Sequence, residues 1–385
     1  MLNLRCPCCD SSDLVQVYPS FSGTCITSDM MILPEASIDN RQCQACGLIF
    51  NAAGTRGRGE AFYRDSYSLM MKSPDASIQS FAGPAPISQA ERTHQILREM
   101  ATLPEQGRVL EAGAGKGDFL TYFVKQSDGW DVHAFEPSVA FETLKERFPK
   151  ASVSHCDYQA VDLGAGTVDL VVALGVLEHV DNPLDMLRWA RAQLKDGGLF
   201  YIRVPNFERN PNDLFCADHL SKLTAPSLHW LAATAGFEVV ASREAGVPIF
   251  ILLRKTSSPQ AAPADVVARN AEIVAKNVAV AKDAMEAIAN CRKQAQAAGE
   301  AFAIFGLGSS GLFAPFSLGF DVADIAGYLD ENKSVWGSGI HGRPVGGLDM
   351  IEKLGIKHVA LAISPVYFQQ VTEKLQKHDV NVYSA

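Results

Sequence analysis

The chain lacks both a long hydrophobic run and an excess of positive charge. No stretch of its 385 residues approaches the roughly 20 apolar residues of a membrane-spanning helix, and its first residues contain no signal-peptide hydrophobic region. The formal net charge of −9 argues against a protein that binds nucleic-acid backbones through a basic surface. We therefore expect a cytoplasmic protein with a small-molecule substrate and with neither nucleic acid nor membrane as partner. Composition leaves the oligomeric state open.

Most of the nine cysteines lie before residue 47, and four of them form two C-x-x-C pairs. Two such pairs supply the four-sulfur shell that a structural zinc ion prefers. The 33 residues between the pairs leave room for a hairpin or a loop. Reduced thiols without a metal are the alternative, and Cys8 or Cys25 could substitute in the shell; disulfides fit a cytoplasmic chain poorly. We expect residues 1–60 to form a zinc-binding module with four ligands: Cys6, Cys9, Cys43 and Cys46.

A glycine-rich segment at residues 107–119 is the most informative part of the chain. A short apolar run ends in Glu111, three glycines follow at alternate positions, and an amphipathic stretch begins near Asp118. Glycine permits a positive φ, and without a Cβ it lets a ligand approach the backbone. The next helix start adds free N–H groups. The segment predicts a strand, a ligand-binding turn and a helix, with Gly113, Gly115 and Gly117 in the turn.

Acidic residues recur where later parallel strands would end. Residues 130–138 predict a strand ending in Glu136, whose carboxylate suits the two hydroxyls of a ribose. Asp157 closes the next segment, where an acid can meet the amino group of an adenine. Residues 168–180 predict a buried strand leading into a polar turn, and residues 194–206 predict a helix end, a turn and a further strand.

This order of elements resembles the class I S-adenosylmethionine-dependent methyltransferases over roughly residues 90–255. The resemblance implies a Rossmann-like α/β core in which Glu111 and the glycine loop hold the methionine end of the cofactor. It assigns Glu136 to the ribose and Asp157 to the adenine. The full set of implied cofactor-binding residues is Glu111, Gly113, Gly115, Gly117, Glu136, Pro137, Asp157, Tyr158 and Leu174. An unrelated Rossmann-like domain with a similar set of acids is the alternative.

Composition divides the remainder of the chain. Residues 61–87 form an aromatic and polar connection that we expect to cover the substrate, and residues 88–255 contain the methyltransferase core. A linker opens residues 256–300, and an Ala-rich stretch without Gly or Pro predicts a helix of roughly 50 Å over 264–298. This helix is expected to strap the core to residues 301–385.

Residues 301–385 begin a second α/β unit with its own glycine loop. A strand over residues 302–305 leads into Gly-x-Gly-x-x-Gly at Gly306, and the next strand ends in Asp330. A third strand and a helix follow. As a pattern this is a dinucleotide site, so the second loop competes with the first for the cofactor role.

The paired cysteines, the methyltransferase core and the C-terminal Rossmann-like subdomain together resemble the zinc-containing C-methyltransferases that act on nucleotide-linked keto-sugars. In that family the C-terminal unit helps to hold the nucleotide-sugar. The resemblance therefore implies substrate contacts from Gly306, Gly308, Asp330, Asn332 and Lys333. The family places a catalytic Glu-His pair after a Val-Pro-Asn element; here Asp218 and His219 follow residues 204–206. An N-terminal tyrosine covers the substrate in the family, and Tyr67 is the nearest match.

Methyl transfer to a carbon beside a carbonyl needs a base to form an enolate and a donor to the developing oxyanion. His219 is the first candidate for this work, because histidine titrates near neutral pH. His179 lies where such sheets bind ligands, and it could shape the methionine pocket or act as base. The catalytic candidates are His219, His179, Asp218 and Tyr67, with Arg203 and Asn206 as further substrate contacts.

Two other functions stay open. The tyrosine that precedes the Glu-His pair in the family is unmatched here, with Phe215 and Cys216 nearby. An O- or N-methyltransferase acting on another small anionic metabolite is therefore the first alternative. A dinucleotide-binding or non-catalytic protein that uses the second glycine loop is the other. The sequence identifies neither the acceptor atom nor the general base.

Overall fold

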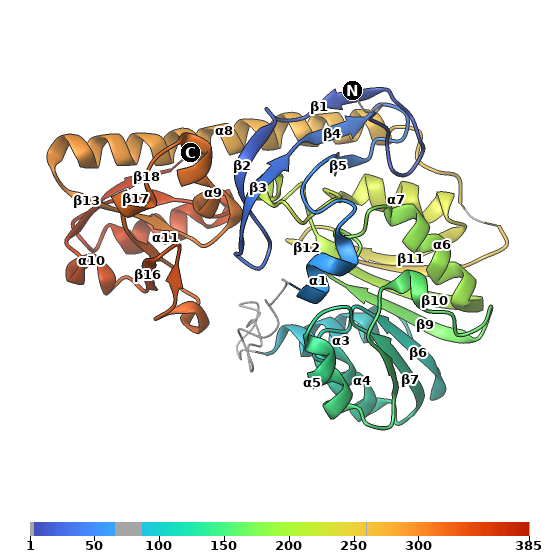
Figure 1. The fold of residues 1–385 in the computed structure, drawn as a ribbon. Coiled ribbons are helices and arrows are strands. Elements are labelled where there is room, and N and C mark those ends of the chain that lie inside the picture. Colours follow the sequence, from blue (N-terminus) through green and yellow to red (C-terminus); the bar gives the residue numbers. More distant parts are fainter. Residues whose placement is uncertain (1–3, 66–86, 259, 385) are drawn as a thin grey trace.

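The computed structural model describes residues 4–65, 87–258 and 260–384. In this part of the chain a small β module, a seven-stranded α/β core and a six-stranded α/β unit are linked by one long helix (Figure 1). No helix within these ranges is both long and apolar enough to cross a membrane. Tyr67, expected to cover the substrate, lies outside the described residues.

The N-terminal module is built from two small antiparallel sheets. Strands β1 (Leu14–Gln16), β4 (Asn40–Cys43) and β5 (Ile49–Asn51) form the first sheet in that order. Strands β2 (Phe21–Ile26) and β3 (Ile32–Ile38) form a hairpin in the stretch between the two cysteine pairs. The short helix α1 (Gly59–Asp65) follows the module.

The core is a largely parallel sheet with one reversed strand. Its strands in spatial order are β11 (Phe237–Arg243), β12 (Pro248–Lys255), β10 (Leu194–Pro205), β9 (Val168–Leu174), β6 (Gln106–Ala112), β7 (Gly129–Phe135) and β8 (Ser152–Ser154). Strand β12 runs antiparallel to both of its neighbours, and every other pairing in the sheet is parallel. This is the Rossmann-like α/β core that the sequence predicted.

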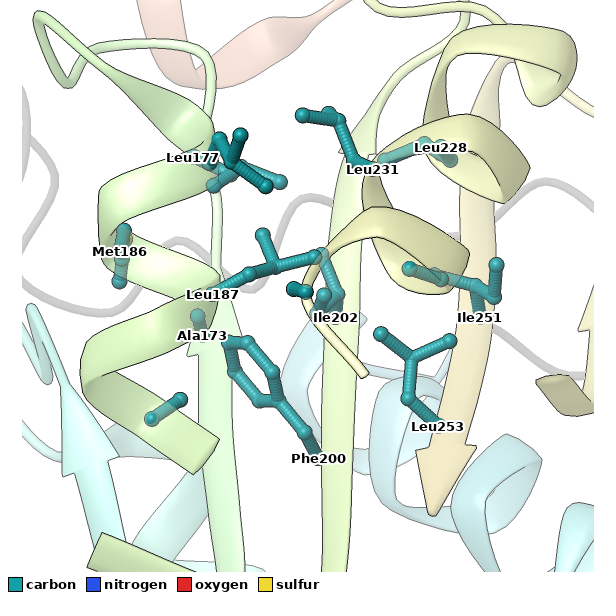
Figure 2. Packing of buried hydrophobic residues seen from close by; sticks show 14 of the residues in the cluster. Ala173, Leu177, Met186, Leu187, Phe200, Ile202, Leu228, Leu231, Ile251 and Leu253 are labelled. Atoms are coloured by element: carbon teal, nitrogen blue, oxygen red, sulfur yellow. The ribbon is translucent and has the colours of Figure 1, made fainter. Parts of the chain in front are cut away.

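Helices cover both faces of the core sheet, which explains the continuous apolar run of β9. Ala173 belongs to the buried cluster on one face and Val172 to the cluster on the other. Figure 2 shows the first cluster, where Leu187, Phe200 and Leu231 fill the space between helices and sheet. The covering helices are α6 (Pro183–Gln193) and α7 (Ala225–Thr234) on that face, and α3 (Gln89–Met100), α4 (Asp118–Gln126) and α5 (Ala140–Arg147) on the other.

The C-terminal unit is a second, smaller Rossmann-like sheet. Its strands in spatial order are β15 (Gly339–Ile340), β16 (Arg343–Gly346), β14 (Ile325–Leu329), β13 (Ala301–Phe305), β17 (Ile356–Leu361) and β18 (Asn381–Tyr383). Its helices are α9 (Ser309–Leu318), α10 (Met350–Lys353) and α11 (Phe368–Leu375). Only β15 pairs antiparallel in this sheet.

Helix α8 (Val266–Ala298) lies along both α/β units (Figure 1). Near its start, Asn270 donates from Nδ2 to the carbonyl of Gly47 in the N-terminal module at 2.8 Å. Farther along, Ile288 is buried in a cluster with strands of the C-terminal unit. The helix ends at Gly299, whose φ of 67° makes a left-handed cap. The long helix expected over 264–298 is therefore present and contacts all three units.

The β2–β3 hairpin is wedged between the core and the C-terminal unit (Figure 1). On one side, the Phe21 ring packs edge-on against Phe313 of α9 with 4.8 Å between centroids. On the other, the carbonyl of Ile26 accepts a hydrogen bond from the N–H of Ala217 at 2.9 Å. The hairpin thus fixes how the two α/β units face each other.

Candidate active site

A cavity of about 2070 Å³ lies between the core sheet, the hairpin and the C-terminal unit. It is larger than the roughly 300–1000 Å³ of an ordinary ligand pocket, so it has room for a cofactor and a second molecule. Each unit contributes to its wall: the core through Glu111 and His179, the hairpin through Ser28, and the C-terminal unit through Leu307 and Asp330.

The first glycine loop follows β6, and all three of its glycines have a left-handed backbone. Their φ values are 60° at Gly113, 55° at Gly115 and 79° at Gly117. A Cβ at Gly113 would come within 2.7 Å of a Val176 methyl carbon. Gly113 and Gly115 line the cavity, whereas Gly117 caps α4 and packs against Phe148, outside the lining. Gly117 therefore shapes the loop without facing a ligand.

Two carboxylates lie beside this loop. Glu136 accepts hydrogen bonds from the N–H groups of Gly115 at 2.7 Å and Ser138 at 2.8 Å. Glu111 is 3% exposed, and its Oε2 atom has no hydrogen-bond partner among the described residues. Burial raises the pKa of Glu111 well above its ordinary value, and the neighbouring carboxylates add to this effect. A buried acid of this kind is suited to receive a cationic group.

The remaining expected cofactor residues extend the same wall. Asp157 accepts a hydrogen bond from the N–H of Tyr158 at 2.6 Å, and the Tyr158 ring packs edge-on against Trp189. Pro137 and Leu174 also line the cavity. The set fits S-adenosylmethionine: Glu111 would meet its ammonium, Glu136 its ribose and Asp157 its adenine amino group.

His179 and His219 both line the cavity and lie next to each other. Their rings pack edge to face with centroids 4.8 Å apart. His179 comes from the turn after β9 and His219 from the segment before α7, so tertiary folding brings them together. A carboxylate oxygen of Glu178 lies within 4.8 Å of a ring nitrogen of each.

Each ring is anchored through Nδ1, but to a different kind of acceptor. His219 is hydrogen-bonded to the carboxylate of Asp213, whereas His179 is hydrogen-bonded to the main-chain oxygen of Asp218 at 2.9 Å. Because a carbonyl oxygen only accepts, the Nδ1 atom of His179 must carry a proton. In the neutral tautomer that carries this Nδ1 proton, the lone pair is on Nε2.

The Asp213–His219 pair is buried and strongly polarised. Burial alone would lower the pKa of His219, but the charge of the Asp213 carboxylate and its hydrogen bond to the ring raise it above the ordinary value for histidine. Burial likewise opposes ionisation of Asp213, and His219 and Lys222 outweigh it and lower the pKa of Asp213. Both groups are therefore charged at neutral pH, which makes His219 a hydrogen-bond donor.

Asp218 does not reach the cavity, since its side chain is fully buried. It accepts hydrogen bonds from the Ser28 N–H at 2.7 Å, the Ser28 hydroxyl at 2.6 Å and the Cys216 thiol at 3.0 Å. Its carboxylate is 3.7 Å from Nδ1 of His179. The sequence pairs Asp218 with His219, but in the structure it lies beside His179.

The far end of the cavity is formed by the C-terminal unit. Asp330, at the end of β14, accepts hydrogen bonds from the N–H groups of Leu307 at 3.2 Å and Asn332 at 2.7 Å. Burial raises the pKa of Asp330, and the bond from Asn332 is the largest effect that opposes it. Asp330 and Asn332 line the cavity, as does Arg203 from the core.

Four expected substrate residues lie elsewhere. Asn206 is 1% exposed, and its amide donates to the carbonyls of Glu244 and Gly246, so it closes a loop behind the sheet edge. Lys333 lies over the Trp336 ring instead of lining the cavity. Gly306 and Gly308 also stand outside the lining, because their loop packs against residue 362 of its own unit.

The two C-x-x-C pairs converge into one cluster. The sulfur–sulfur distances are 3.5 Å for Cys6–Cys46 and 3.5 Å for Cys9–Cys43, and all four sulfurs lie within 4.8 Å of one another. Tetrahedral zinc with Zn–S bonds of about 2.3 Å needs sulfurs about 3.8 Å apart. Cys8 and Cys25 do not join the cluster. The four thiolates thus fit a closed structural zinc site.

Three residues of the site carried no recognisable sequence signal. Asp213 and Lys222 flank His219 in the chain, but neither spacing is typical of a catalytic pair. Lys222 is fully buried and donates to the carbonyls of Cys216 and His219, both at 2.9 Å. Ser28 is 190 residues from Asp218. Only the packing of the hairpin against the core brings Ser28 to Asp218.

Comparison with known proteins places the core in a family. Residues 88–242 match the family model described as a methyltransferase domain. A protein of Mycolicibacterium smegmatis named a probable S-adenosylmethionine-dependent methyltransferase is 30% identical over 155 residues, which cover 38% of this chain and 59% of that protein. A Mycobacterium tuberculosis protein of the same description is 29% identical over 157 residues, covering 39% of this chain and 56% of that protein. The chain thus spans less than two thirds of the length of these relatives.

Among solved structures, the 1,6-didemethyltoxoflavin-N1-methyltransferase of Burkholderia thailandensis aligns with a TM-score of 0.36 at 24% identity. The alignment covers 44% of this chain and 79% of that one. The family match and the two curated relatives agree with the donor-site geometry. Residues 88–242 are therefore an enzymatic domain of the class I S-adenosylmethionine-dependent methyltransferases.

Proposed function

We propose that this protein methylates a carbon atom beside a carbonyl group in a small molecule, and that a nucleotide-linked keto-sugar is its substrate class. One observation carries the proposal: His179 and His219 lie in a single cavity whose walls come from the donor site and from the C-terminal unit. A cavity of about 2070 Å³ suits two large ligands that meet near this pair.

The C-terminal half of the cavity supports a nucleotide-bearing substrate. Asp330 presents a carboxylate at the end of β14, where such sheets bind ligands, and a carboxylate suits ribose hydroxyls. The second glycine loop is a poorer dinucleotide site. A Cβ at Gly306 would meet the carbonyl of Ala362 at 2.7 Å, and one at Gly308 would lie 3.7 Å from the Asn212 amide of the core. Packing against the chain's own atoms therefore accounts for the absence of side chains at these two positions.

The histidine pair supports carbanion chemistry. S-adenosylmethionine supplies an activated methyl group for in-line displacement. His219, cationic through Asp213, would donate a hydrogen bond to the carbonyl oxygen as negative charge develops there. His179, with its Nδ1 proton bonded to the Asp218 carbonyl, would accept the substrate proton at Nε2. This division revises the sequence-based preference for His219 as the base.

The four-cysteine cluster supports a structural zinc ion in the N-terminal module. All four positions of a tetrahedral ion would be filled by sulfur, so no position is open for substrate. The module has little core of its own, so metal binding would contribute directly to its folding. The zinc ion would therefore stabilise the module and take no part in methyl transfer.

The acceptor can be identified with S-adenosylmethionine that carries a ¹³C-labelled methyl group. The full chain is incubated with a panel of nucleotide-linked keto-sugars, and the product methyl is observed by NMR. A label bonded to carbon supports the proposal. A label bonded to oxygen or nitrogen would replace it with the O- or N-methyltransferase alternative, and tight NAD binding without methyl transfer would favour the dinucleotide alternative.

Variants test the assigned residues in the same assay. His219→Asn should reduce turnover by roughly 10²–10⁴-fold and leave S-adenosylmethionine affinity within about twofold. His229→Asn is the matched control, because His229 lies on α7, pairs with Glu244 and is absent from the cavity lining. Unchanged turnover in His219→Asn would remove His219 from the mechanism.

A further inference from the structure

Three acidic side chains in the described part of the chain have a buried carboxylate oxygen without a hydrogen-bond partner: Glu111, Asp213 and Glu178. Glu111 is expected to meet the ammonium of S-adenosylmethionine. Asp213 is bonded through its other oxygen to His219. Glu178 has no role in the donor site or in the histidine pair, although it lines the same cavity.

The main chain around Glu178 is fixed by hydrogen bonds. Its carbonyl accepts one from the N–H of Ser221 at 3.0 Å, and the N–H of the next residue, His179, donates to the Val176 carbonyl at 2.9 Å. Glu178 as a whole is only 3% exposed. The turn after β9 therefore holds the backbone from which this carboxylate extends.

The carboxylate of Glu178 lies beside the histidines at which the methyl acceptor is expected. One of its oxygens is within 4.8 Å of a ring nitrogen of His179 and of a ring nitrogen of His219. All three side chains line the cavity. A ligand that reaches His219 therefore also comes close to Glu178.

A buried carboxylate oxygen without a donor is unfavourable for the protein that carries it. Its lost hydration is not offset by any hydrogen bond from residues 4–65, 87–258 or 260–384. A side chain of similar size without this oxygen would avoid the cost. Native proteins retain such groups where function requires them. We therefore expect the missing donor to belong to a ligand.

The missing donor should be a neutral group. His219 is cationic through its pairing with Asp213, so an ammonium group beside it would meet a like charge. A hydroxyl donates to a carboxylate without adding charge, and hydrogen bonds to ionised acceptors are strong. Oxygen atoms on neighbouring carbons of a sugar are about 3 Å apart, close to a hydrogen-bond length. With the carbonyl oxygen at His219, a hydroxyl on the next carbon would lie near Glu178.

We propose that Glu178 is a specificity-determining residue that binds a hydroxyl group on a carbon next to the carbonyl of the methyl acceptor. The inference rests on the proposed function, because that function places the carbonyl at His219. It extends that function by selecting hydroxy ketones over ketones that lack the hydroxyl. A site built to accept from a hydroxyl rejects the analogue without it, because the buried carboxylate then stays unpaired.

The test is isothermal titration calorimetry of the full chain with S-adenosylhomocysteine, which fills the donor site and permits no methyl transfer. The probes are a 4-keto-6-deoxyhexose with a hydroxyl at C3 and its 3-deoxy analogue, each linked in turn to dTDP, UDP and GDP. The wild type should bind the hydroxy ketone roughly 10–100-fold more tightly than the 3-deoxy analogue. Glu178→Met, which has no strong acceptor, should bind the two with affinities within about twofold of each other.

Two further variants support the comparison. Glu178→Gln keeps one acceptor oxygen without the charge, so it should prefer the hydroxy ketone less strongly than the wild type does. Glu238→Met is the matched control, because Glu238 pairs with Arg254 on the surface and is absent from the cavity lining. It should discriminate between the probes as the wild type does. Urea unfolding should show that Glu178→Met is at least as stable as the wild type, since no hydrogen bond to the carboxylate is lost.

Equal affinity of the wild type for the two probes, or discrimination that persists in Glu178→Met, would overturn this inference alone. An equal weakening of both probes in Glu178→Met would also overturn it, because the carboxylate would then act through its charge and not through the hydroxyl. So would a marked loss of stability in that variant, which would reveal a structural partner. Failure of the wild type to bind either probe with any of the three nucleotides would overturn the proposed function, and this inference with it.

Discussion

Asp213 and His219 form a hydrogen-bonded pair. Asp213 is only 2% exposed, so its carboxylate is shielded from solvent. Asp213 sits in the 3-10 turn Pro211–Phe215, and His219 follows six residues later. The chain between them folds back because Ala217 pairs with the hairpin at Ile26. Two units, the core and the N-terminal module, therefore contribute to the position of one imidazole.

Asp213→Asn should lower the pKa of His219 and destabilise the fold by about 3–5 kcal/mol, since it breaks a buried ion pair. The folded pKa of His219 lies above its unfolded value of about 6.5. Its stabilisation is therefore complete below about pH 6.5 and is lost as pH rises through the folded pKa. Urea unfolding of both proteins should show a larger stability difference near pH 6 than near pH 9.5.

Asp196→Asn is the control for this substitution, because the Asp196 side chain is 99% exposed and makes a surface contact to Lys255. Its effect should be about 0–1 kcal/mol at most. Asp213 remains ionised across the whole window, because its own pKa lies below the ordinary value. A stability difference that does not change with pH would contradict the assigned role of His219.

Glu111 gives a prediction for cofactor binding. The pKa of this buried carboxyl is raised well above its ordinary value, so it holds a proton in the free protein at pH values where most carboxyls are ionised. The ammonium of S-adenosylmethionine would favour the ionised form. Affinity should therefore increase with pH, by up to about tenfold per unit, while the ammonium itself stays protonated below about pH 7.5.

Isothermal titration calorimetry in buffers of different ionisation enthalpy measures both the affinity and the proton released. Glu111→Gln should bind more weakly and should lose the pH dependence. Glu146→Gln, an exposed change on α5, should behave as the wild type. An affinity of the wild type that is flat with pH would show that Glu111 does not meet the ammonium.

Lys222 supports the segment that carries the catalytic groups. Its buried ammonium donates to the carbonyls of Cys216 and His219, both at 2.9 Å. Lys222→Met removes both donors and leaves two buried carbonyls unpaired, which should cost on the order of 2–5 kcal/mol. Because Lys222 also lowers the pKa of Asp213, that pKa should rise in the variant.

Chemical denaturation measures the loss, and carboxyl ¹³C NMR of labelled aspartates follows Asp213. Lys195→Met is the control, since Lys195 forms a half-exposed surface bridge with Asp169. That bridge should contribute about 0–1 kcal/mol. Equal losses of stability in Lys222→Met and Lys195→Met would show that the buried hydrogen bonds of Lys222 contribute no more than a surface charge does.

Local signals in the sequence were sufficient to predict the strands, the turn and the helix that carry the expected donor-site residues. The glycine loop, the acid that ends each strand and the absence of Gly and Pro over 264–298 each reflect a backbone requirement within a few residues. Positive φ at Gly113, Gly115 and Gly117 shows why glycine is needed there. The seven-stranded sheet follows from such units because each strand–helix pair repeats the same geometry.

The residues around the expected methyl acceptor could not be predicted from local sequence signals. Ser28 meets Asp218 across 190 residues, and that contact depends on how the hairpin packs. The glycines at 306 and 308 matched a dinucleotide pattern, yet their missing Cβ atoms make room for Ala362 and for the approach of Asn212. Asn206 stood on the expected sheet edge, but its amide closes a loop. A residue's side-chain partner, which decides its role, is a tertiary property.

The four-cysteine cluster leads to a prediction about metal removal. Cys43 lies at the end of β4, and the carbonyl of Gly47 just beyond the second cysteine pair accepts a hydrogen bond from Asn270 of α8. Cys43→Ser should abolish zinc binding and lower the melting temperature, because the apparent binding energy of a structural zinc is about 10–16 kcal/mol in small domains. We expect the loss of zinc to weaken the packing of the N-terminal module on α8.

Elemental analysis should find one zinc per wild-type chain and less than about a tenth of that in Cys43→Ser. Cys156→Ser is the matched control, because Cys156 lies in the core outside the cluster and should retain both the metal and the melting temperature. S-adenosylmethionine should still bind to Cys43→Ser, since the donor-site residues belong to the core sheet. A wild-type chain without zinc but with an unchanged melting temperature after chelation would exclude the structural role of the metal.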